Sequence, residues 1–169
     1  MQMTLKLWGL LMIALLVKAI ALPDLHAQAP PRGKDNKTKA QKPEPRVAEL
    51  ITTLRSGTPD ARANAAQALG EMGPSALSDL LQALRTDGKS WRSWGAAAMA
   101  KMGPKAIAPM VKALNDNDEY VRLAIVTALG EMGPIASEAT PTLQRLSQVD
   151  SDDRVRAMAK VAINQINRK

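Results

Sequence analysis

The chain has 169 residues, enough for one ordinary domain or a short array of repeats. Hydrophobic residues make up 46% and aromatic residues only 2%, so the apolar mass is chiefly Ala, Leu, Met, Ile and Val, which favours helices over strands. Cysteine is absent, which excludes disulfides and thiolate metal sites. The formal charge of +7 lies largely in residues 30–43, so the remaining chain is near neutral and we expect no nucleic-acid site.

Residues 1–29 have the features of an export signal. Lys6 gives the N-terminal region of the signal its positive charge, and residues 7–17 form an apolar run. Ala27–Ala29 fits a small-x-small cleavage site. Lys18 ends the run before the roughly 20 apolar residues that a membrane span needs. We therefore predict a cleaved signal and a periplasmic or extracellular location in the bacterial envelope. The alternative is an uncleaved anchor, because residues 19–22 could extend the run.

Residues 30–45 are predicted to form a basic, disordered linker. Four prolines stand among Lys, Asn, Gln and Thr, and no hydrophobic period is present. Such a segment buries too little apolar surface to offset the entropy of ordering it. We interpret it as a solvated tether, with contact to anionic lipid, cell wall or nucleic acid as the alternative. Membrane contact is expected only through this linker or an uncleaved signal.

Residues 46–169 are predicted to form one helical domain. Val47, Leu50, Ile51 and Leu54 keep the spacing of one helix face, and Gly57–Asp60 then breaks the chain and starts another helix. Further helices are expected at about 77–84, 91–102, 107–114, 121–132, around Leu143 and Leu146, and at 152–166. The total is about eight, and the first and last are expected to cap the domain.

A 30-residue period organises this domain. The Gly-Pro pairs at 73–74, 103–104 and 133–134 are 30 residues apart, which indicates stacked repeats. Gly is expected to close one helix in a left-handed conformation and Pro to open the next. Alignment on these pairs places four arginines in one column, with spacings of 30, 30 and 34: Arg62, Arg92, Arg122 and Arg156. The four extra residues fall in 135–140 and 149–151.

These features resemble a HEAT-repeat protein of the PBS-lyase HEAT-like type. The closest copy of the pattern is Asp118–Arg122, followed by Ala128–Gly130 and Gly133–Pro134, and the resemblance covers residues 44–166. It implies an all-α fold, a short right-handed α-solenoid of antiparallel helix pairs whose second helices line the concave side. Some relatives attach bilin chromophores to cysteines, but no residue here matches their catalytic motifs, and most other relatives are scaffolds.

The arginine column and two acidic runs are interpreted as structural. We expect each arginine to bond acidic side chains and loop carbonyls between repeats, with phosphate or carboxylate binding as the alternative. The acids precede two helices, where carboxylates cap free N–H groups; a Ca²⁺ site is the alternative, and no metal is predicted. The acids are Asp116, Asp118, Glu119, Asp150, Asp152 and Asp153.

The predicted partner-binding surface lies mainly on the second helices. Gln82, Lys112 and Gln144 share a column that faces away from the leucine stripe, and Arg85, Asn115 and Ser147 extend it. Trp94 is added as a possible hot spot, since neighbouring repeats hold small or polar residues there. Trp94 and Trp91 could equally fill a gap between repeats.

Catalysis has little support in the sequence. The one histidine, His26, lies in the predicted signal, and Ser78 and Ser90 have no evident base and fit helix N-caps. We therefore expect a non-enzymatic, cofactor-free, monomeric scaffold that is exported and binds a protein partner through a concave face. The alternatives are a subunit of a chromophore-lyase-type enzyme and a passive envelope spacer.

Overall fold

The computed structural model describes residues 46–87 and 89–168, which belong to one compact unit. The predicted signal and linker lie outside this part of the chain. The described residues form helices and no strands, so the all-α prediction is confirmed, and none of these helices is long and apolar enough to cross a membrane. The α-helices are α2 (Val47–Ser56), α3 (Pro59–Met72), α4 (Leu77–Asp87), α5 (Arg92–Ala100), α6 (Ile107–Ala113), α7 (Glu119–Met132), α8 (Thr140–Val149) and α9 (Asp153–Ile166).

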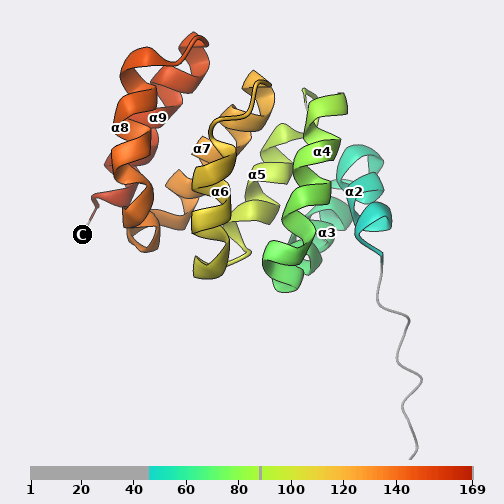
Figure 1. The fold of residues 1–169 in the computed structure, drawn as a ribbon. Helices are drawn as coiled ribbons and strands as arrows, with labels where there is room; N and C mark the ends of the chain where they lie inside the picture. Colours follow the sequence, from blue (N-terminus) through green and yellow to red (C-terminus); the bar gives the residue numbers. More distant parts are fainter. Residues whose placement is uncertain (1–45, 88, 169) are drawn as a thin grey trace, which may run out of the picture. The chain divides into compact units, whose positions relative to one another are not determined.

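The helices of residues 46–168 lie in two layers. Helices α3, α5, α7 and α9 pack side by side in chain order, each against the next. Figure 1 shows α4, α6 and α8 in front of α5, α7 and α9. Odd- and even-numbered helices therefore belong to different layers, and each 30-residue unit contributes one helix to each.

A short 3₁₀ helix joins the two helices of each unit: η1 (Gly73–Ala76), η2 (Pro104–Ala106) and η3 (Gly133–Ala139). The glycines that precede the prolines have φ of +64°, +74° and +64°, as predicted for helix-closing glycines. Their ψ values, −148°, −176° and −142°, differ from the left-handed helical value expected from the sequence. This extended region with positive φ is almost confined to glycine. The longer η3 accommodates the insertion predicted at 135–140.

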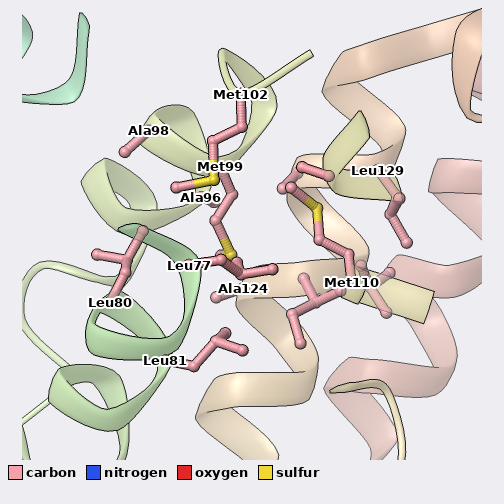
Figure 2. Close-up of a cluster of buried hydrophobic side chains, with 14 of the residues drawn as sticks. Leu77, Leu80, Leu81, Ala96, Ala98, Met99, Met102, Met110, Ala124 and Leu129 are labelled. Carbon is pink, nitrogen blue, oxygen red and sulfur yellow. The ribbon is translucent and has the colours of Figure 1, made fainter. Parts of the chain in front are cut away.

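The hydrophobic core fills the space between the layers (Figure 2). Leu80 from α4, Met99 from α5 and Met110 from α6 have no exposed surface, and Ala124 and Leu129 from α7 complete the group. Unbranched methionines adapt to the irregular gaps that small alanines leave between helices. Because each unit buries its apolar face against its neighbours, the period of the sequence sets the period of the core.

Candidate functional site

The even-numbered helices carry an exposed polar surface that includes five of the six predicted partner-binding residues. Gln82 and Arg85 lie on α4, Lys112 on α6 and Gln144 on α8, and Asn115 follows the end of α6. All five are exposed. Their positions repeat because the hydrophobic residues on the opposite faces of these helices point into the core. We call these five residues the polar face.

Hydrogen bonds link the polar face from one repeat to the next. Arg85 donates to the Gln82 side chain at 2.7 Å and, through Nε, to Asp116 Oδ2 at 3.0 Å. Arg145 on α8 donates to the Asn115 side chain at 3.3 Å. Burial alone would raise the pKa of Asp116, but the hydrogen bond from Arg85 helps hold that pKa below its usual value. Side chains on this surface are therefore partly ordered before any partner binds.

Trp94 is not part of this surface. It lies on α5, in the layer of odd-numbered helices, and packs half-buried against the core. Trp91, just before α5, is fully buried, and Arg55 stacks over its ring at 5.5 Å. The alternative interpretation of Trp91, a gap filler, is therefore the correct one. Gly95 makes room for it, since a Cβ there would lie 3.3 Å from the Trp91 ring.

Arg122 has both kinds of partner that were predicted for the arginine column. Its side chain is buried and donates twice to Asp150, from Nε at 2.9 Å and from Nη2 at 2.8 Å. Nη1 also donates to the backbone carbonyls of Asp116 and Asn117. The guanidinium thus joins the loop before α7 to the loop before α9.

The other arginines of the column differ from Arg122 and from one another. Arg62 donates to the Arg55 carbonyl at 2.8 Å, and Arg156 donates to the Asp150 carbonyl and pairs with Asp153. Arg92 has no acidic partner among the described residues. Its guanidinium lies 5.3 Å from the Tyr120 ring, and its Nη1 is shielded from solvent without a hydrogen-bond partner.

The acidic runs serve as helix caps and as arginine partners. Asp118 accepts from the N–H groups of Tyr120 and Val121 at the start of α7. Asp152 accepts from those of Arg154 and Val155 at the start of α9. The capping prediction is therefore confirmed. Across residues 46–87 and 89–168, no group of three potential ligands lies close enough to hold a metal ion.

The carboxylates at the last loop have lowered pKa values. Burial alone would raise the pKa of Asp150, but hydrogen bonds from Arg122 and from the Asp152 N–H outweigh it and place that pKa below its usual value. The hydrogen bond from the Arg154 side chain lowers the pKa of Asp152 to about 2. Both side chains therefore carry full negative charge near neutral pH.

The N-cap prediction fails for the two serines. Ser78 lies inside the first turn of α4, and the residue that precedes α5 is Trp91, which makes no side-chain cap. The reason at α4 is that η1 runs directly into the helix, so no extended capping residue occurs.

Sequence reasoning also missed Arg55 and Tyr120. Arg55 could have been found, because it stands 30 residues before Arg85.

Paired helices at a fixed period, joined by Gly-Pro turns, define a helical repeat protein. Residues 90–164 match the family model of HEAT repeats, and residues 61–86 match the PBS lyase HEAT-like repeat. Residues 61–86 and 90–164 therefore contain HEAT-type repeats. A search of curated proteins found no match to the chain.

Proposed function

We propose that this HEAT-repeat chain is a non-catalytic scaffold that binds a protein partner through the polar face. In this proposal the eight helices form a short right-handed solenoid of antiparallel pairs, with the polar face on its concave side. The protein acts as a monomer in the bacterial envelope, after its signal is cleaved. The observation that carries the proposal is the polar face itself, which spans α4, α6 and α8 and is exposed throughout.

Two properties of the polar face favour protein recognition. It combines amides with the cations Arg85 and Lys112, so it can donate to carbonyls and carboxylates along an extended partner segment. The hydrogen bonds around Arg85 and Asn115 already order several side chains, which reduces the entropy lost on binding. HEAT repeats are commonly protein-interaction scaffolds.

Site-specific photo-crosslinking in the source cell tests this proposal. A photoreactive residue replaces Gln144 on the polar face of α8, and the matched control replaces Asn164, an exposed residue on α9 in the other layer. We expect a discrete protein adduct from position 144 and none from position 164. Lys112→Glu in the same chain should weaken the adduct. Equal labelling from both positions, or none from position 144, would reject the polar face as the site.

A subunit of a chromophore-lyase-type enzyme is the second candidate. Its support is the match of residues 61–86 to the PBS lyase HEAT-like repeat. If this function were correct, the purified chain would bind a bilin and change its visible absorption spectrum. A spectrum that stays unchanged over a bilin titration would leave the scaffold as the better account.

A further inference from the structure

A pocket of about 260 Å³ lies on the odd-numbered layer, away from the polar face. Its lining comes from the segment before α5 and from α5, α7 and α9. Leu123 and Thr127 line it from α7, the middle helix of the three. Ala96 lines it from α5 and Met158 from α9. The pocket thus spans three consecutive repeats and depends on their stacking.

The polar end of the pocket is cationic. Lys89 and Arg92 line it, together with the hydroxyl groups of Ser90 and Ser93. Lys89, Ser90 and Ser93 are exposed and accessible to a ligand. Arg92 contributes the guanidinium whose Nη1 lacks an acceptor although solvent does not reach it. Arg92 as a whole is only half-buried, so its other guanidinium N–H groups can donate to an oxygen that enters the pocket.

This pocket differs in charge from two others on the same domain. In the pocket between α2 and α4, Arg55 is accompanied by Asp79, and in the pocket beside α4, Arg85 is accompanied by Asp116 and Asp118. The pocket at Arg92 has two cations and no acid in its lining. The repeat pattern makes the contrast sharper, because Arg122 in the same column has Asp150 as its partner. Arg92 therefore lacks the counter-charge that Arg122 possesses.

We propose that this pocket binds an acidic side chain of a protein partner together with an adjacent aliphatic side chain. The carboxylate would accept charge-assisted hydrogen bonds from Arg92 and the Ser93 hydroxyl, with Lys89 as a further cation. The aliphatic side chain would pack on Ala96, Leu123 and Met158, which supply the apolar part of the lining. This site goes beyond the proposed function, since it lies in the other helix layer and recognises a different chemistry.

The test is a titration of the isotope-labelled full chain with two peptides, followed through backbone amide chemical shifts. The probe is acetyl-Ala-Glu-Leu-Ala-amide, and the control is the same peptide with Gln in place of Glu. We expect shifts at Ser93, Leu123 and Thr127 with the Glu peptide and affinity at least about tenfold lower for the Gln peptide, because a charged acceptor bonds more strongly than a neutral one.

Charge-reversal variants locate the site. Lys89→Glu should abolish the chemical-shift response to the Glu peptide. Ser93→Glu, at a second exposed position, should do the same, so the conclusion does not depend on the folding of one variant. Lys105→Glu, an exposed lysine in η2, is the matched control and should leave the response intact. The proposal is overturned if both peptides bind equally, if neither binds, or if the shifts cluster on α4, α6 and α8. Because the polar face is tested by a crosslink at position 144, failure of one proposal is distinguishable from failure of the other.

Discussion

Arg122 and Arg92 occupy the same column of the repeat but make different interactions. Arg122 is buried with Asp150 in a double hydrogen bond, whereas Arg92 stacks on Tyr120 and has no acidic partner in the described part of the chain. The same residue type at the same repeat position is thus a structural crosslink in one unit and an uncompensated cation in another. Arginines at equivalent positions of the repeat therefore need not contribute equally to the free energy of unfolding.

Arg122→Ala should therefore destabilise the domain far more than Arg92→Ala. Removing Arg122 leaves the buried Asp150 carboxylate unpaired, which we expect to cost about 3 kcal/mol. Removing Arg92 loses mainly a cation–π contact, worth about 1 kcal/mol or less. Denaturant unfolding of the two variants measures the difference. Equal losses would show that the column acts uniformly, as the sequence alone suggested.

The pair formed by Arg122 and Asp150 should also make stability depend on pH. The folded-state pKa of Asp150 is lowered, so its contribution is complete above the unfolded value of about 3.9 and is lost as pH falls through the folded value. Asp150→Asn should thus be less stable than the parent chain at pH 7, and the gap should shrink below about pH 4. Asp87→Asn, at an exposed position at the end of α4, is the control. A gap that stays constant with pH would exclude this linkage.

Close packing between α3 and α5 depends on the glycine at position 70. In α3, a Cβ added at Gly70 would lie 2.3 Å from Lys101 Cβ, at the end of α5. Lys101 Cβ is fixed to the backbone, so relief requires the two helices to separate. Gly70 therefore has a packing role, while Gly73, three residues later in the chain, has the conformational role described for the Gly-Pro turns.

Gly70→Ala should consequently lower the melting temperature, even though alanine is the better helix former by about 1 kcal/mol. The sign of the change in melting temperature is the test, because helix propensity alone predicts that Gly70→Ala stabilises the domain. Asn64→Ala, on an exposed position of the same helix, reports the propensity gain without the contact and should be neutral or slightly stabilising. Thermal unfolding followed by circular dichroism compares the two; a more stable Gly70→Ala variant would contradict the packing role.

The sequence predicted the helices well because period and hydrophobic spacing are properties of the chain itself. The Gly-Pro turns and the Asp caps of α7 and α9 were found for the same reason: each depends on residues close together along the chain. The positions of Trp94 and of the acid partner of each arginine depend on contacts between helices. Alignment placed Trp94 with the partner-binding candidates and Arg92 with Arg122, but only packing shows that Trp94 lies in the other layer and that Arg92 lacks an acid.

At the scale of the whole molecule, the two helix layers separate two surfaces. The polar face follows the even-numbered helices, and the cationic pocket at Arg92 opens on the odd-numbered ones. Both surfaces are composed of side chains from successive units, so neither exists within a single repeat. Stacking is therefore the property on which both proposed binding sites depend.

Deleting residues 74–103 tests that stacking most directly. The deletion removes one 30-residue period and joins Gly73 to Pro104, which regenerates a Gly-Pro turn. Because each unit contacts mainly its neighbours, we predict a shorter chain that still unfolds cooperatively and keeps its helical circular dichroism per residue, with lower stability. As a control, charged substitutions at Leu80, Leu81 and Leu84 in the full chain should unfold it. A deletion variant without helical structure would contradict the stacked-repeat account.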